Sequence, residues 1–132
     1  MKDVCHRFDD MLWHDSKLLE LKIYRTNSKE HVRVRVGLRQ LSAGPRLVDI
    51  VFLDSTYFES KIDLEGKRVC SDDIAAAGSY GASSWLQELA RSSPYDSFAG
   101  YIHFRIDLIP PGGSINILAK DFVVQDVTPS SV

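Results

Sequence analysis

Strict alternation of apolar and polar residues in two neighbouring segments constrains this fold more than any other feature of the sequence. Residues 19–24 place Leu or Ile at every second position, and residues 32–38 do the same with Val and Leu after the polar stretch 26–30. Because successive side chains of a strand point to opposite faces, each segment predicts a strand with one buried face. Two such strands joined by a short polar loop predict an antiparallel hairpin.

Four more segments read as strands. Residues 47–53 are nearly all apolar, which is typical of a central strand covered on both faces. A turn or bulge is expected at residues 54–55, followed by a strand over residues 57–64. Residues 101–108 alternate again, and residues 115–124 form a last strand. The phase of that last strand slips near Ala119-Lys120-Asp121, which indicates a bulge.

The middle of the chain predicts two short helices. Ser71 is placed to cap a helical turn over residues 72–77, which Gly78 would end. Ser84 and Gln87 have the spacing of a capping box that opens a helix over residues 85–91. The apolar residues of this second helix fall on one stripe, so we expect it to pack on the sheet.

These elements predict an α+β fold: one domain over residues 1–132, with a largely antiparallel sheet of about six strands and one or two helices packed on it. The ends, residues 1–11 and 127–132, are expected to be frayed. A hydrophobic content of 44% in 132 residues is enough for a core, and a net charge of −2 argues against disorder.

The sequence also suggests where the protein resides. No segment has the roughly 20 consecutive apolar residues that cross a membrane, and the first residues do not resemble a signal peptide. Cys5 and Cys70 lack the spacing of a disulfide framework and read as two reduced thiols. We therefore expect a soluble cytoplasmic protein without a membrane partner.

The most distinctive motif is Trp13-His14-Asp15-Ser16, just before the first predicted strand. A His beside an Asp suggests a general base and its orienting carboxylate, although neighbours on an extended chain point to opposite faces. The structural alternative, which we favour, has Trp13 closing the end of the sheet. His14 and Asp15 would then fasten the chain through hydrogen bonds to backbone groups.

No cofactor or metal is expected from the sequence. The side chains that could bind a metal lack the spacing of known zinc or iron motifs. They are Cys5, His6, His14, His31 and His103.

A basic cluster marks the predicted hairpin, because residues 17–46 contain eight Lys or Arg and two Glu. Arg33 and Arg35 share one strand face and would suit an anion or a single-stranded nucleic acid. We favour a solvated face instead, in which these cations meet carboxylates on nearby strands. The candidate carboxylates are Glu20, Asp49, Glu59 and Asp63.

A second mixed row, Tyr101, His103, Arg105 and Asp107, lies on the polar face of the strand predicted over residues 101–108. Tyr and Arg are frequent anchors of protein interfaces, and an ordinary exposed sheet face has the same composition. Arg33, Arg35, Tyr101, His103 and Arg105 are therefore the candidate partner contacts.

Several short motifs resemble a group of small, mostly uncharacterised bacterial α+β proteins. The motifs are the Trp13-His14-Asp15-Ser16 opening, the line Val48-Asp49-Ile50-Val51-Phe52-Leu53-Asp54, and the C-terminal hairpin from Phe104 to Phe122. Some families with this pattern are similar to immunity proteins of polymorphic toxin systems, which neutralise a toxin by binding it. The resemblance implies a bacterial, cytoplasmic setting and supplies no catalytic residues. It has no counterpart for the glycine-rich stretch from Gly78 to Gly81.

The leading hypothesis is thus a non-enzymatic binding domain, of the immunity type, that covers a toxin-like partner protein. One alternative is a small-ligand or hydrolytic pocket built from His14, Asp15 and His103. Another is weak nucleic-acid binding through the basic hairpin. We favour a protein partner over a nucleic acid. Pairing of exposed strand edges could also make a homo-oligomer.

Overall fold

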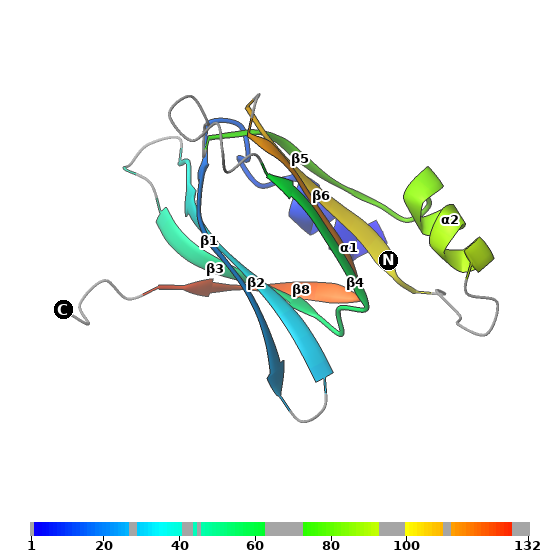
Figure 1. Ribbon diagram of the computed structural model, residues 1–132. Coiled ribbons are helices and arrows are strands. Elements are labelled where there is room, and N and C mark those ends of the chain that lie inside the picture. The colour runs from blue at the N-terminus through cyan, green and yellow to red at the C-terminus, as the bar shows by residue number, and fades with distance from the viewer. Residues whose placement is uncertain are drawn as a thin grey trace.

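In the residues that the structure describes, eight antiparallel strands form two sheets that face each other across one core (Figure 1). The computed structural model describes residues 2–26, 29–40, 44, 46–62, 73–92, 100–109 and 112–127. Sheet A has the strand order β1-β2-β3-β8, and sheet B has the order β4-β7-β6-β5. In chain order the elements are α1 (Lys2–Asp9), β1 (Lys17–Thr26), β2 (Lys29–Leu38), β3 (Arg46–Leu53), β4 (Tyr57–Ile62), β5 (Ile74–Tyr80), α2 (Ser84–Ser92), β6 (Ile102–Leu108), β7 (Gly113–Ala119) and β8 (Asp121–Asp126).

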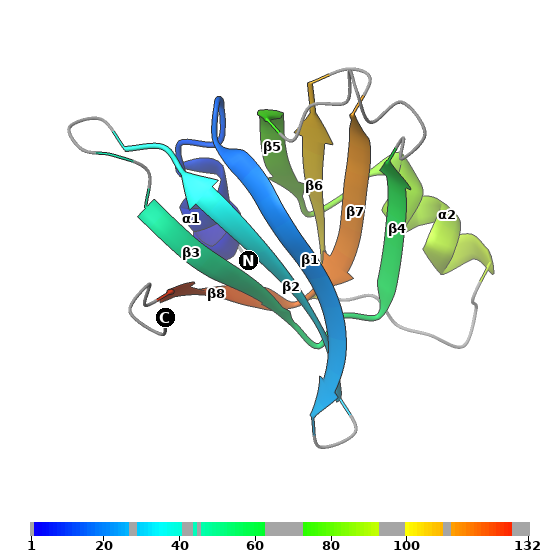
Figure 2. The same ribbon diagram turned by 60° about the vertical axis from the view of Figure 1, so that its left-hand side comes forward.

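The α+β class is confirmed, but the expected single sheet of about six strands is wrong in detail. Two long strands bend and cross from one sheet to the other: β3 continues into β4, and β7 continues into β8. Since β3 pairs with β8 and β4 pairs with β7, a single two-stranded ribbon belongs to both sheets (Figure 2). The bends lie at Asp54, with a φ of 54°, and at Lys120, where a turn and a bulge were expected.

The predicted hairpin is confirmed by β1 and β2, which pair from Lys17 with Gly37 to Thr26 with Lys29. Its buried face contains Val32, Val34 and Val36, each at most 1% exposed. On the same sheet β3 lies between β2 and β8, as expected for the apolar segment 47–53. Alternation therefore located the hairpin and the buried face of β2. The buried face expected for β1 is wrong in part, because Leu19 and Ile23 are 51% and 53% exposed. A register shift between Leu18 and Glu20 brings Leu18 to the core in place of Leu19.

Aromatic rings fill the space between the two sheets. Phe52 of sheet A and Phe104 of sheet B lie 4.9 Å apart between ring centroids, and Phe122 packs beside both. Phe8 of α1 completes this cluster at 4.9 Å from Phe104 and 5.4 Å from Phe122. All four side chains are at most 2% exposed.

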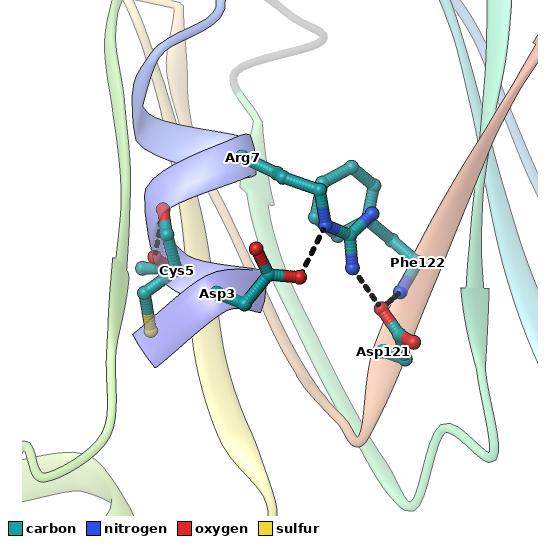
Figure 3. Close-up of polar contacts among 6 residues, drawn as sticks. Asp3, Cys5, Arg7, Asp121 and Phe122 are labelled. Carbon is teal, nitrogen blue, oxygen red and sulfur yellow. Dashed lines mark hydrogen bonds and ion pairs between the residues drawn. The ribbon is translucent and has the colours of Figure 1, made fainter. Parts of the chain in front are cut away.

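Helix α1 corrects the expectation of a frayed N-terminal end. The helix lies across the opening between β5 and β8, and Arg7 pairs with Asp121 of β8 at 3.0 Å (Figure 3). Toward β5, Ser79 Oγ donates to Asp9 Oδ1 at 2.8 Å. Arg7 also pairs with Asp3 within the helix at 3.2 Å. The segment is too short to be a stable helix alone, so its helical state depends on burying Phe8 in the core.

Strand β5 corrects the short helix predicted over residues 72–77. Ile74–Tyr80 pairs with β6, and the backbone of Ile74 also bonds residues 15 and 16 at the start of β1. These tertiary hydrogen bonds override a local preference for helix that is worth only tenths of a kcal/mol per residue. Residues 63–72 lie outside the described part of the chain, so Asp63, Cys70 and Ser71 are not placed.

Helix α2 confirms the helix expected over residues 85–91, with a shifted cap. The N–H of Leu86 donates to Ser83 Oγ at 3.1 Å, so the capping residue is Ser83 rather than Ser84. In both views α2 lies on the side of sheet B that faces away from sheet A (Figures 1 and 2). None of the described helices is long and apolar enough to cross a membrane.

Candidate functional site

The outer face of sheet B contains two buried polar side chains beneath α2. His103 of β6 is 4% exposed and Asn116 of β7 is 5% exposed, although both point away from the core between the sheets. The ring centroid of Trp85 in α2 lies 4.6 Å from that of His103, and the ring centroid of Tyr80 in β5 lies 5.6 Å from it. The sequence placed His103 on an outer strand face, and α2 turns that face into the floor of a site.

Four side chains from four segments form one hydrogen-bonded chain on this floor. Ser83 Oγ lies 2.8 Å from His103 Nδ1, and His103 Nε2 lies 2.7 Å from Asn116 Oδ1. Asn116 Nδ2 donates to Glu59 Oε1 of β4 at 3.4 Å. The chain extends from the cap of α2 across three strands of sheet B.

The order of donors and acceptors in this chain follows from Glu59. A carboxylate accepts hydrogen bonds only, so Asn116 turns its NH₂ group toward Glu59 and its carbonyl oxygen toward His103. That oxygen requires a proton on His103 Nε2, which leaves Nδ1 as the acceptor for the Ser83 hydroxyl. The network therefore fixes one neutral tautomer of His103.

Burial lowers the pKa of His103, because the low-dielectric surroundings disfavour the charged imidazolium. The nearby Arg105 adds to this lowering, while the hydrogen bond to Asn116 and the charge of Glu59 oppose it. His103 is consequently neutral at pH 7. A neutral imidazole whose unprotonated nitrogen accepts from a hydroxyl group has the protonation state that a general base requires.

A cleft of about 420 Å³ opens above this network, between α2 and the outer face of sheet B. Its size falls in the range of about 300–1,000 Å³ that is usual for small-molecule sites. The lining residues are Glu59, Tyr80, Ser83, Ser84, Trp85, His103, Arg105, Asp107 and Asn116.

Charge and donors in the cleft are unevenly distributed. Arg105 Nε donates to Asp107 Oδ1 at 2.9 Å, so these two charges neutralise each other. Glu59 then gives the described lining one excess negative charge. Ser84 and Trp85 also line the cleft, and their N–H groups precede the first hydrogen bonds of α2, so they have no partner within the helix.

Two of the three arginines expected to contact a partner, Arg33 and Arg35, lie elsewhere, on the outer face of sheet A. Arg35 makes two hydrogen bonds to Asp49, at 2.8 and 3.0 Å, and Arg33 pairs with Glu20. The hydrogen bonds from Arg35 lower the pKa of Asp49. The pairing with Glu20 and Asp49 that the sequence favoured is present for these two arginines, but the face is not fully solvated, because Asp49 is only 8% exposed.

Tyr101 is also separate from His103, although only one residue lies between them. It lies just before β6, and the Lys120 ammonium lies 5.2 Å from its ring centroid. Together they line a different, more open cleft of about 470 Å³ with Arg25 and Lys29. Arg105 is thus the one other predicted contact that the structure brings to the same cleft as His103.

The Trp13-His14-Asp15-Ser16 motif forms the corner where β1 meets β5. Trp13 is 4% exposed and donates from Nε1 to the carbonyl of Phe8 at 2.7 Å. His14 Nδ1 lies 3.1 Å from the carbonyl of Ala75, and the Asp15 N–H donates to Ile74 at 3.0 Å. These contacts match the structural role expected for the motif.

His14 and Asp15 do lie close together, against the expectation for neighbours on an extended chain. Asp15 has a φ of 67°, in the left-handed region, and this turns its carboxylate to 3.5 Å from His14 Nε2. The pair sits beside Ala75, whereas His103 pairs with Tyr80, five residues further along β5. At about 3.3 Å per residue, the two sites are roughly 16 Å apart. The hydrolytic pocket of His14, Asp15 and His103 is therefore not formed.

The four histidines of the sequence are dispersed over different elements of the fold. In the part of the chain that the structure describes, no three His, Cys, Asp or Glu side chains come together as a metal site would require.

Sequence analysis did not assign five of the lining residues to a site: Tyr80, Ser83, Ser84, Trp85 and Asn116. It expected Glu59 to pair with the basic hairpin instead. Trp85 was assigned to an apolar stripe, and Asn116 interrupts the apolar run Ile115–Ala119 with a polar side chain. A polar residue inside such a run is the one available signal. Comparison with known proteins adds nothing further, since no family model, curated protein sequence or solved structure matches this chain.

Proposed function

We propose that this chain binds a small neutral ligand, with an aromatic ring and a carbonyl group, in the cleft between α2 and sheet B. One observation carries the proposal: the buried chain Ser83–His103–Asn116–Glu59 forms the floor of an open cleft. Buried polar groups destabilise a fold unless they are paired, and an outer sheet face has no structural need for them.

The aromatic part of the ligand is inferred from the walls of the cleft. Trp85 and Tyr80 both line the cleft, with ring centroids 4.6 and 5.6 Å from that of His103. Aromatic rings favour offset or edge-to-face packing with another ring, worth about 0.5–1.5 kcal/mol beyond the buried area. A planar ring is therefore the group that these walls accept best.

The neutral carbonyl is inferred from the charge and the donors. Glu59 disfavours an anion, and Arg105 with Asp107 presents no net charge. The hydroxyl of Ser84 and the first N–H groups of α2 are hydrogen-bond donors, which a carbonyl oxygen accepts. Amides and esters of aromatic acids or alcohols meet both requirements.

The indole N–H signals in a ¹H–¹⁵N NMR spectrum test this proposal. The chain has two tryptophans, with Trp85 in the cleft and Trp13 in the core. Titration with benzamide should shift the Trp85 signal saturably and leave the Trp13 signal in place. The Trp85→Phe variant assigns the two signals. Equal shifts of both indoles, or no saturable shift of Trp85, would contradict the proposal.

Benzoate is the matched anionic probe. We expect it to bind more weakly than benzamide, because Glu59 repels it, and the Glu59→Gln variant should narrow the difference between the two. Gln keeps an oxygen that can accept from Asn116, so the network is preserved. Equal affinity of the wild-type protein for both probes would overturn the charge argument.

Occlusion of a toxin-like protein, and with it the bacterial, cytoplasmic and oligomeric expectations, stays a prediction from the sequence. Its candidate contacts divide between two faces, because Arg33 and Arg35 lie on sheet A while His103 and Arg105 belong to the cleft. The geometry supports the cleft as the binding site more directly than it supports either face.

A further inference from the structure

Ser83 has more than the contacts of a capping residue. A cap needs only to accept a hydrogen bond, as Ser83 Oγ does from the Leu86 N–H at 3.1 Å. Its hydroxyl proton is directed to His103 Nδ1 at 2.8 Å, and the side chain lines the cleft. An O–H group held against the acceptor nitrogen of a neutral imidazole is the arrangement of an activated nucleophile.

His103 is held in that role by groups behind it. Asn116 Oδ1 accepts from Nε2 at 2.7 Å and fixes the ring, and Glu59 fixes Asn116 at 3.4 Å. Nucleophile, base and orienting group thus follow one another within hydrogen-bond reach. This is the geometric criterion for covalent catalysis by a serine.

We propose that Ser83 accepts the acyl group of a neutral aryl ester bound in the cleft, with His103 as general base; this rests on the ligand-binding function proposed above. Ser83 Oγ forms a bond to the acyl carbon and gives its proton to His103 Nδ1. The carbon–oxygen bond to the leaving group then breaks, and the proton passes from Nδ1 to the leaving oxygen. The products of this step are a free phenol and acyl-Ser83.

Water completes the cycle. A water molecule attacks the acyl carbon and gives one proton to His103 Nδ1, and that proton returns to Ser83 Oγ as the acid leaves. The net reaction is the hydrolysis of an ester to an acid and a phenol. The oxyanion formed in both steps would face the N–H groups of Ser84 and Trp85, which line the same cleft. Asn116 and Glu59 act as positioning residues.

Incubation with p-nitrophenyl acetate tests the proposal, with release of p-nitrophenol followed by absorbance and the acetyl group located by peptide mass spectrometry. We expect one acetyl group on Ser83. The His103→Gln variant should acylate about 10²–10⁴-fold more slowly, the usual contribution of a general base. Acetyl groups found only on lysines or the N-terminus, or an unchanged rate in His103→Gln, would overturn the proposal.

Ser83→Asn separates chemistry from folding, because Asn caps a helix as well as Ser and has no hydroxyl. It should lose the adduct, while its urea-denaturation midpoint stays close to that of the wild type. Ser92→Ala is the control on the same helix; Ser92 Oγ bonds the carbonyls of Glu88 and Leu89 and lies outside the cleft lining. Benzamide binding without a Ser83 adduct would overturn acylation alone, while absence of both would overturn the binding function as well.

Discussion

At the scale of single residues, His103 determines how the cleft behaves. Its ring accepts a hydrogen bond from Ser83, donates one to Asn116 and packs against Trp85, so one imidazole connects α2 to sheet B. A second proton on Nδ1 would remove its acceptor site and place a cation beside Arg105. Folding and the site therefore depend on the same protonation state.

We predict that the free energy of unfolding falls as the pH decreases below the ordinary histidine pKa of about 6.5. The folded-state pKa of His103 is lowered, so the unfolded chain binds more protons in this range. The stabilisation is complete above the unfolded pKa and is lost as the pH falls toward the folded one. Urea denaturation at several pH values measures the free energy of unfolding of the wild type and of His103→Gln. The contributions of the other three histidines cancel in the difference between the two proteins.

An NMR titration of the His103 ring gives the same information directly, and its midpoint should lie below that of the urea-unfolded chain. A midpoint at or above the unfolded value would contradict the burial argument.

Asp49 contributes to stability in a separate pH range. Its pKa is also lowered, so its contribution to the free energy of unfolding is present above the ordinary aspartate pKa of about 3.9 and is lost only in stronger acid.

The sequence identified His103 but not its partners, for a physical reason. Ser83 lies 20 positions before His103 and Asn116 lies 13 after it. Their contact depends on the strand register and on where α2 folds back, and neither is encoded in local periodicity. His14 and Asp15, adjacent in the chain, were easier to notice and belong to a structural corner.

At the scale of elements, periodicity predicted the strands that contact the core and failed where long-range contacts decide. The β1–β2 hairpin, the central β3 and the helix α2 follow from alternation, apolar runs and a nearby cap. Strand β5 and helix α1 do not, because backbone hydrogen bonds to β6 and β1 hold β5. Helix α1 is held by the buried Phe8 ring and by polar contacts with Asp121 and Ser79. Their sequences carry little local preference.

For α1, we predict that removing the Phe8 ring destabilises the protein. Phe8→Ala should destabilise the protein by about 3–5 kcal/mol, the usual cost of removing a fully buried Phe, because Phe8 contacts Trp13, Phe52, Phe104 and Phe122. His6→Ala, on the exposed side of the same helix, should change stability by at most about 0.5 kcal/mol. Equal effects of the two substitutions in urea denaturation would show that α1 does not dock as described.

At the scale of the whole molecule, two features join the sheets. The bent ribbon of β3–β4 and β7–β8 crosses from sheet A to sheet B on one side. On the other side, the Ile74 N–H donates to the carbonyl of Ser16 at 2.7 Å, and an isolated bridge pairs Lys17 with Asp73. The Trp13-His14-Asp15-Ser16 motif thus closes the fold, which explains why so distinctive a sequence lies away from the cleft.

Ser16 tests this closing role. It is fully buried, its Oγ donates to the carbonyl of Leu12 at 2.7 Å and accepts from the Arg39 N–H at 2.8 Å. Ser16→Ala leaves both backbone groups unpaired, and we expect a loss of about 1–3 kcal/mol of stability. Hydrogen exchange should show faster exchange at Ile74, whereas Ser60→Ala, at an exposed position of β4, should leave both measurements unchanged.

The same variant separates structure from function. Because the corner lies roughly 16 Å from His103 along β5, folded Ser16→Ala protein should keep the benzamide shift of Trp85 and the acylation of Ser83. Loss of benzamide binding or of Ser83 acylation in a variant of unchanged stability would show that Trp13-His14-Asp15-Ser16 belongs to the functional site. Loss of stability with both activities retained assigns the motif to the closure of the two sheets and leaves ligand recognition to the cleft beneath α2.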